Sequence, residues 1–446
     1  MTDQAVIQRA LKRFSSCELA EDIPDTLPLV DELCNCRVTD DIFADMDVVF
    51  IQHHLGPFIP RLRATLNRGL EPSRCWFVDI PYSTNESVRK ALLGLGFSDK
   101  HISDPFNDPI AQYSRNQLDR VARVLRILAN QDNKKRLLVV DDGAYFIRTL
   151  IYLLATDAGL VRSFRERGTY LVEQTTRGHR YLETEMGKDL LRTLNIPAVS
   201  VARSHTKYSL ESRFIGVAVS RGFIRALRQS GRLTKGLGRV LVIGFGPVGK
   251  STTEQLSRLE HEGLIEVYDK EWKILQGEIQ RDGKAIALQS FPDKGYYDSI
   301  FGCTGYTSFP VEKVGILSND AVLVSGSSAA IEFNREQFVD LACESESDDF
   351  FVIEPEKTRS RGIHATIKMQ KGNKKFSFLN AGFPANFDGS LECLPALIIQ
   401  ITHGLLLAAS QEALHSSPGF HRLNRYDDDW LHQRGMYWIK QYALAA

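Results

Sequence analysis

Residues 244–251 read GFGPVGKS, a stretch that fits two phosphate-binding patterns at once. As G-x-G-x-x-G it matches the turn that holds a dinucleotide, with glycines at Gly244, Gly246 and Gly249. As G-x-x-x-x-G-K-S it matches the P-loop of nucleoside triphosphatases, which ends here in Lys250 and Ser251. The two patterns predict different enzymes, so the surrounding sequence has to decide between them.

The residues around the glycines favour the dinucleotide pattern. An apolar run precedes Gly244 and the helical stretch TTEQLSRLEHEG follows, with Lys250 and Ser251 in its first turn, which gives the required strand, turn and helix. Asp269 ends the next apolar run, roughly 20 residues after the glycines, where a carboxylate accepts hydrogen bonds from ribose hydroxyls. That carboxylate would repel a 2′-phosphate, so NAD is predicted in preference to NADP. A P-loop enzyme needs a carboxylate for Mg²⁺, and the candidate at 137–142 lies in what reads as another domain.

Apolar runs followed by helical stretches recur along the chain. DVVFIQHH, CWFVDIPYS and RLLVVDDG are early examples, and the alternation restarts with GRVLVIGFG, LIEVYD and DAVLVSGSS. Continuous Val, Ile and Leu runs between helices are typical of parallel sheets covered on both faces. We therefore predict an α/β fold with two doubly wound domains, one of them a Rossmann NAD-binding domain with a parallel sheet. The predicted boundaries are 1–213 for a substrate-binding domain completed by about 388–425, 214–387 for the Rossmann domain, and 426–446 for a C-terminal tail.

Composition narrows the class of protein. The 446 residues include 55 basic and 55 acidic side chains, a balance that creates no field for nucleic acid or an anionic membrane. The apolar segment from Leu391 is broken by Pro395, Gln400 and His403, so we expect a buried helix there and not a membrane span. The 7 cysteines lack paired spacing, which favours reduced thiols over a disulfide framework or a metal site. We expect a cytoplasmic protein that binds a small molecule.

The glycine segment GRVLVIGFGPVGKS resembles the cofactor loop of the S-adenosylhomocysteine hydrolases, and other segments follow in that family's order from about residue 25 to about residue 410. The resemblance implies a tightly held NAD that oxidises the ribose 3′-hydroxyl of the substrate and so acidifies the neighbouring carbon-bound proton. Elimination of homocysteine, addition of water and reduction of the ketone then follow. It also implies a homodimer or homotetramer. The matching segments are QHHLGPF, YSTNE, LVVDDG, LVEQTTRG, SHTKYSLES, IFGCTGY, DAVLVSGSS and FLNAGFPANF.

The resemblance implies catalytic roles for several side chains. Lys207 stands at the family's lysine beside the 3′-hydroxyl, and Glu211 stands at its aspartate partner. A lysine in a dry cleft can serve as a base near neutral pH. His54 and Asp142 fall on a histidine and a carboxylate that work near the reacting carbon and the leaving group. Taken alone, Lys207 would be a solvated charge, His54 a histidine at a strand end, and Asp142 a helix cap.

Further matches concern the cofactor. Thr175 and Thr176 fall on a threonine run that contacts the nicotinamide half of NAD in the family, and Asn380 falls on an asparagine with similar work. Thr304 and Gly305, in IFGCTGY, belong to the same predicted site. The predicted NAD site is therefore Gly244, Gly246, Pro247, Val248, Gly249, Asp269, Thr175, Thr176, Thr304, Gly305 and Asn380.

The departures from the family concern the substrate. Gln174 replaces a glutamate that contacts the sugar hydroxyls, and its amide can hydrogen-bond but cannot take a proton. Arg177 stands where the family has the third threonine of the run that begins at Thr175. Unpartnered polar groups of a buried adenine would cost about 1–3 kcal/mol each, which disfavours adenosine as the substrate. This chain also differs from the family at other positions. Gly56, Phe58 and Phe387 replace family residues that contact the substrate, Ser328 and Ala329 replace the pair at the access channel, and Gly216 replaces a cysteine near the nicotinamide. The family's C-terminal tail is absent.

Several functions are compatible with these residues. The first is an NAD-dependent enzyme that oxidises a secondary, ribose 3′-type hydroxyl of a nucleoside or sugar-like molecule other than adenosylhomocysteine. The second is adenosylhomocysteine hydrolysis at a divergent site, and the third is an NAD-bound regulatory protein without catalysis. A 2-hydroxy acid dehydrogenase ranks last, because its substrate arginine and His-carboxylate pair cannot be placed convincingly in the second half of the chain.

Overall fold

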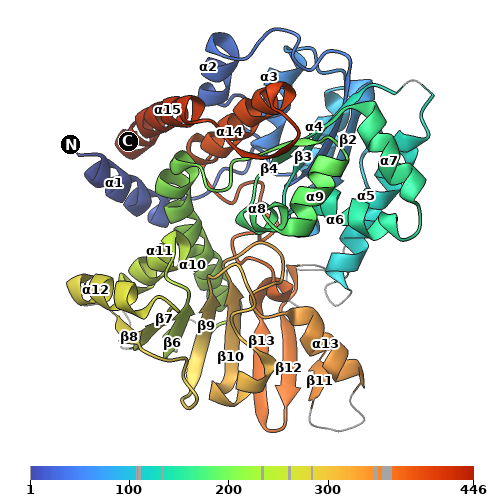
Figure 1. The fold of residues 1–446 in the computed structure, drawn as a ribbon. Coiled ribbons are helices and arrows are strands. Elements are labelled where there is room, and N and C mark those ends of the chain that lie inside the picture. The colour runs from blue at the N-terminus through green and yellow to red at the C-terminus, as the bar shows by residue number, and fades with distance from the viewer. Residues whose placement is uncertain are drawn as a thin grey trace.

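The computed structural model describes residues 2–106, 108, 112–132, 134–232, 236–259, 263–282, 285–344, 350–353 and 364–445. These residues build two sheets with helices on both faces, the first in the upper part and the second in the lower part of Figure 1. The predicted α/β class is confirmed.

The first sheet has six strands in the order β14-β5-β4-β3-β1-β2, and every neighbouring pair is parallel. Every residue of β1 is buried, because alternate side chains face two different helix layers. Val48 and Phe50 pack into one layer, and Val49 and Ile51 pack into the other. The order 2-1-3-4-5 reverses direction between β1 and β3. The strands are β1 (Met46–Gln52), β2 (Cys75–Asp79), β3 (Arg136–Asp141), β4 (Thr169–Glu173), β5 (Pro197–Ser200) and β14 (Gly419–Arg422).

Helices from both ends of the chain cover the first sheet. On the face of Val48 and Phe50 the core includes side chains of α1 (Asp3–Ser16), α2 (Pro28–Cys36), α3 (Phe58–Leu66), α4 (Glu86–Gly94), α14 (Ala396–His415) and α15 (Arg425–Leu444). On the face of Val49 and Ile51 it includes side chains of α5 (Tyr113–Ala129), α6 (Tyr145–Leu154), α7 (Ala158–Arg167), α8 (Thr176–Leu182) and α9 (Glu185–Thr193).

The second sheet has eight strands in the order β11-β12-β13-β10-β9-β6-β7-β8. The strands β8-β7-β6-β9-β10-β13 pair in parallel, in the order 3-2-1-4-5-6 of a Rossmann domain. Strands β12 and β11 continue the sheet beyond β13 in antiparallel pairing. The direction reverses between β6 and β9. The strands are β6 (Val240–Ile243), β7 (Ile265–Tyr268), β8 (Ile286–Leu288), β9 (Tyr297–Gly302), β10 (Leu317–Ser325), β11 (Phe350–Ile353), β12 (Ile367–Lys371) and β13 (Lys374–Phe378), and the helices are α11 (Pro247–Ser257), α12 (Trp272–Asp282) and α13 (Arg335–Glu344).

Helix α10 (Ser212–Gln229) joins the two domains. Phe214 and Val217, near its start, belong to the core of the first domain, whereas Val219 and Phe223 belong to that of the second. One continuous helix therefore fixes how the two sheets face each other.

The C-terminal segment belongs to the first domain. Helix α14 is long and apolar enough to cross a membrane by length and composition, but 67% of its most apolar window is buried inside the fold. Residues 426–446, predicted as a separate tail, lie largely in α15, whose Leu431 and Ile439 are fully buried in the first core. This prediction is corrected: the apolar residues of α15 recur at helical spacing and pack against α1 and α14.

Candidate active site

A cavity of about 240 Å³ lies where the carboxyl ends of the two sheets face each other. His53 and Asp142, which follow β1 and β3, line it from the first domain. Val248 in α11 and Gly305 after β9 line it from the second. In open α/β sheets ligands bind at the carboxyl ends of the strands where the strand order reverses, and this cavity adjoins both reversal points.

The glycine loop is shaped for close approach by a ligand. Gly244 has φ +97°, and a Cβ there would lie 2.8 Å from the carbonyl oxygen of Cys303. A Cβ on Gly249 would lie 1.9 Å from the Gly244 carbonyl oxygen, so this glycine lets α11 pack against the loop. A Cβ on Gly246 would meet no atom within 4 Å. The space over Gly246 at the start of α11 therefore fits the pyrophosphate of a dinucleotide.

The P-loop residues are directed elsewhere. The Lys250 ammonium pairs with Glu278 of α12, and the Ser251 hydroxyl donates to the backbone oxygen of Arg213. Both side chains thus serve helix packing and do not reach into the loop. This arrangement supports the dinucleotide interpretation over the P-loop.

Asp269 follows β7 and lies beside the glycine loop. Its Oδ2 accepts from the Phe245 amide at 2.7 Å, and its Oδ1 accepts from the Glu271 amide at 2.9 Å. A carboxylate oxygen can accept more than one hydrogen bond. Asp269 is therefore fixed where ribose hydroxyls of a bound dinucleotide can donate to it.

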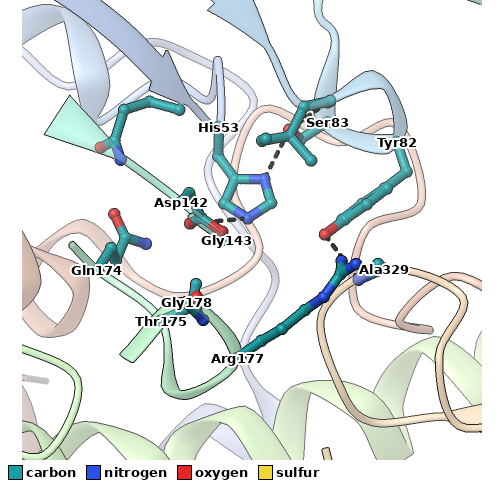
Figure 2. A network of polar contacts seen from close by, with 12 residues as sticks. His53, Tyr82, Ser83, Asp142, Gly143, Gln174, Thr175, Arg177, Gly178 and Ala329 are labelled. Carbon is teal, nitrogen blue, oxygen red and sulfur yellow. Dashed lines mark hydrogen bonds and ion pairs between the residues drawn. The ribbon is translucent and has the colours of Figure 1, made fainter. Parts of the chain in front are cut away.

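His53 and Asp142 form a proton-sharing pair in the cavity (Figure 2). The Ser83 hydroxyl donates to the Ile80 carbonyl at 2.8 Å, so it accepts from His53 Nδ1 at 2.7 Å. The proton of the neutral ring is then on Nδ1, and the bare Nε2 lies 3.5 Å from Asp142 Oδ2. Burial raises the pKa of Asp142 to about 7 and lowers the pKa of His53 to about 3. Near neutral pH the Asp142 carboxyl is therefore partly protonated, whereas the His53 ring is neutral with its Nε2 unprotonated.

Lys207 and Glu211 lie on a π-helical turn immediately before α10. The Lys207 ammonium donates to the backbone oxygen of Gln174 at 3.0 Å, and Glu211 accepts from the Thr402 hydroxyl. All four of these residues line the cavity. Burial raises the pKa of Glu211, whereas the charge of Lys207 lowers it. In the described part of the chain, no ion pair joins Lys207 to Glu211.

Thr175 and Thr176 also line the cavity, at the start of α8. Thr175 Oγ1 accepts from the Gly178 amide at 3.0 Å and donates to the buried carboxylate of Glu173 at 2.8 Å. Glu173 also accepts from the backbone amides of Gly143 and Ala144, which follow β3. Glu173 thus ties the turn after β4 to the turn that carries Asp142.

Half of the predicted site residues do not line the cavity: Gly244, Gly246, Pro247, Gly249 and Asp269 at the glycine loop, and His54, Thr304 and Asn380. His54 is 4% exposed and stacks on Phe58 with ring centres 5.4 Å apart, because consecutive residues at a strand end point to opposite sides. Thr304 donates its amide and hydroxyl to the buried Glu332. The Asn380 amide nitrogen donates to the carbonyl oxygen of Pro384, which holds a loop turn together. His53, and not the predicted His54, therefore faces Asp142 in the cavity. Thr304 lies beside Gly244 of the glycine loop, and the predicted cofactor contacts of Thr304 and Asn380 stay predictions.

Other polar residues of the site were not identified from sequence. Glu332 accepts from the Thr304 and Gly305 amides and the Ser327 hydroxyl, and so joins the loops after β9 and β10. His403, in α14, lines the cavity, and burial lowers its pKa well below the usual value. Neither belongs to a spacing pattern. The consecutive histidines His53 and His54 indicated a functional histidine at this strand end, but the sequence does not show which of the two rings faces the cavity.

Comparisons with known proteins give limited information. No family model matches the chain. Over 387 residues the chain is 26% identical to two uncharacterized proteins of Mycobacterium tuberculosis, from strains CDC 1551 / Oshkosh and H37Rv, with 86% of this chain and 67% of each relative covered. The resemblance to adenosylhomocysteine hydrolases therefore stays a prediction.

Two solved structures are similar to part of the fold. An NAD-dependent formate dehydrogenase from Staphylococcus aureus in complex with NAD has a TM-score of 0.30 at 15% identity, with 50% of this chain and 64% of that chain covered. A D-lactate dehydrogenase from Treponema pallidum has a TM-score of 0.30 at 12% identity, with 67% and 75% covered. Similarity of this size does not define an activity, so function has to be argued from the cavity itself.

Proposed function

We propose that this protein is an adenosylhomocysteinase-like, NAD-dependent enzyme that oxidises a secondary, ribose 3′-type hydroxyl of a nucleoside or sugar-like substrate. One observation carries the proposal. The cavity joins the reversal point of a Rossmann sheet, with its open glycine loop, to a second reversal point that bears Asp142 and His53, and Lys207 lines the same cavity from the turn before α10. A dinucleotide site and a set of proton-transfer groups thus adjoin one enclosed space.

The residues of the second domain fit NAD. The start of α11 at Gly246 would hold the pyrophosphate, and Asp269 would accept from the ribose hydroxyls. NAD supplies the two-electron acceptor for the carbon that bears the substrate hydroxyl. Val248 and Gly305, which reach the cavity, place the reactive end of such a ligand beside the groups of the first domain.

The first domain supplies proton transfer. The backbone carbonyl of Gln174 orients Lys207, whose neutral amine form takes the proton of the substrate hydroxyl and becomes the ammonium as the carbon is oxidised. Asp142 handles a second proton, because a carboxyl group with a pKa of about 7 can take up or release a proton near neutral pH, and His53 lies beside it. A carbon-bound proton next to the new carbonyl is acidic enough to be removed there. Glu211 adds a carboxylate on the same π-helical turn as Lys207.

The apolar side of the cavity supports a substrate other than adenosylhomocysteine. The Phe387 ring stacks on His53 with centres 4.4 Å apart, and Phe58, Leu55 and Leu394 also line the cavity. Such side chains offer no hydrogen bonds to the polar edge of adenine, whose burial there would cost free energy.

The test uses the purified full chain. Acid extraction identifies any bound dinucleotide, and absorbance of enzyme-bound NADH is followed while adenosine, adenosylhomocysteine, other nucleosides and sugars are added. We expect reduction by at least one compound, loss of reduction in Lys207→Ala, and retention in Lys188→Ala, which removes a half-buried lysine of α9 that pairs with Glu185. Thiol release from adenosylhomocysteine would instead establish the hydrolase activity. Bound NAD that the whole panel leaves oxidised would contradict the proposed activity and favour a regulatory protein.

A further inference from the structure

Two guanidinium groups lie near one tyrosine ring at the edge of the cavity. The Arg177 guanidinium carbon is 5.8 Å from the centre of the Tyr145 ring, and that of Arg148 is 5.3 Å from it. Arg177 lines the cavity, and its Nη1 donates to the Tyr145 hydroxyl at 3.4 Å. Figure 2 shows the Arg177 side chain extended toward Tyr82 and away from Gln174. The cavity thus has a second cationic side chain, Arg177, in addition to Lys207.

These two arginines lack the carboxylate partner that a buried guanidinium requires. In the described part of the chain, no acidic side chain forms an ion pair with Arg148 or Arg177. Nη1 of Arg148 is buried without a hydrogen-bond partner, and burial together with the charge of Arg177 lowers the pKa of Arg148. By contrast, the buried Arg167 pairs with Asp47. Asp142 is near enough for the charge of Arg177 to lower its pKa, but among the described residues it forms no ion pair with Arg177, so the guanidinium can bind an anion from outside the chain.

We propose that Arg177 binds an anionic group, a carboxylate or a phosphate, of the substrate whose hydroxyl is oxidised in the proposed function. A guanidinium presents parallel donors that match the two oxygens of either group. Its one hydrogen bond to the Tyr145 hydroxyl orients the fork and leaves donors free. Arg148 adds positive charge behind it.

The anion belongs to the substrate and not to the cofactor. Arg177 interacts with Tyr145, and its charge acts on Tyr82 and Asp142, which are all residues of the first domain. The space for a pyrophosphate lies over Gly246, in the second domain. The Tyr82 hydroxyl accepts from the backbone amide of Ala329, so Arg177 lies near the place where a loop of the second domain meets the first.

Equilibrium binding to the NAD-loaded protein tests the inference without requiring turnover. The probes are inorganic phosphate and two matched series: uridine, uridine 5′-monophosphate and uridine 5′-carboxylic acid; and glucose, glucose 6-phosphate and glucuronate. We expect an acidic member or inorganic phosphate to bind, and Arg177→Gln to weaken that binding roughly ten- to hundredfold. Neutral members should be unaffected. The phosphate and carboxylate members show which anion is preferred.

Matched variants separate this role from a structural one. Arg162→Gln removes an exposed charge from α7 and should change nothing, whereas Arg177→Lys keeps the charge and should restore part of the affinity. Because an unpaired buried charge is removed, Arg177→Gln should not lower the thermal midpoint of the unliganded protein. Equal binding of every probe by wild type and Arg177→Gln, or no binding of any anion by wild type, would overturn the inference. So would a loss of NAD affinity without a change in anion binding.

The two proposals can fail separately. Anion binding that depends on Arg177, with no reduction of bound NAD by any compound, would keep the inference and contradict the oxidation of a hydroxyl. Reduction of bound NAD by neutral compounds, unchanged in Arg177→Gln, would keep the proposed function and overturn the role of Arg177.

Discussion

Replacement of Gly246 by alanine tests the dinucleotide site most directly. Gly246 has φ −65° and ψ −176°, a conformation that alanine adopts without strain, and its Cβ would meet no protein atom within 4 Å. The free energy of unfolding should therefore change by no more than about 0.5 kcal/mol. The new methyl group would occupy space that a pyrophosphate needs over the start of α11. Gly246→Ala should thus be folded but defective in NAD binding.

The size of the binding defect follows from crowding. An extra carbon in a closely packed site typically costs about 1–3 kcal/mol, which corresponds to a roughly five- to 150-fold higher Kd for NAD. Calorimetric titration of dinucleotide-free protein with NAD measures Kd, and thermal unfolding measures stability. Gly277→Ala is the matched control, because its Cβ on α12 would also meet no atom within 4 Å and it lies outside the loop.

The outcome discriminates sharply because the two substitutions are chemically identical. Equal Kd values for wild type, Gly246→Ala and Gly277→Ala would refute the placement of the pyrophosphate at the start of α11. A large loss of stability in Gly246→Ala would show that the space over this residue is used by the protein itself.

Three further predictions concern individual side chains. His53→Ala should lower kcat for hydroxyl oxidation with little change in the thermal midpoint, whereas His54→Ala should cost about 2 kcal/mol or more in stability because it leaves a void beside Phe58. Asp142 has a pKa raised from 3.8 to about 7, so its contribution to stability is present below pH 3.8 and is lost as pH rises through 7. Asp142→Asn should remove this pH-dependent part of the free energy of unfolding, as measured by denaturant unfolding at a series of pH values. It should also remove the change in reaction rate near pH 7. If wild type and Asp142→Asn show the same pH dependence in both measurements, the assignment is contradicted. Asp269→Asn should raise the Kd for NAD and reduce the preference for NAD over NADP, and titration with both dinucleotides checks this.

Much of the fold was accessible from sequence because both sheets are covered on both faces. Strands such as β1 are then buried along their whole length and appear as continuous apolar runs. Strand β14 gave no such run, because Gly419–Arg422 forms a partly exposed edge. Its place in the sheet depends on pairing with β5, more than two hundred residues away in sequence, which no local pattern encodes.

The site was predictable only to the level of strand ends. Asp142, Gln174 and Lys207 follow or precede regular elements whose ends meet in the cavity, so their convergence could be anticipated. The choice between His53 and His54 could not, because a shift of one residue reverses the side of the sheet that a ring faces. Asn380 has φ +52°, and its side-chain nitrogen donates to the Pro384 carbonyl within its own turn, a contact that the sequence did not indicate.

The proposed reaction needs groups from both domains. The proton-transfer groups follow strands of the first sheet, whereas the glycine loop follows β6 of the second, and α10 sets the distance between them. A Cβ on Gly216 would lie 2.5 Å from the Val248 carbonyl oxygen, so α10 can approach α11 only because this residue is glycine. Lys207 lies on the turn that leads into α10, and Val248 reaches the cavity from α11. The close packing at Gly216 therefore determines how near a cofactor over the glycine loop would come to Lys207, the proposed base.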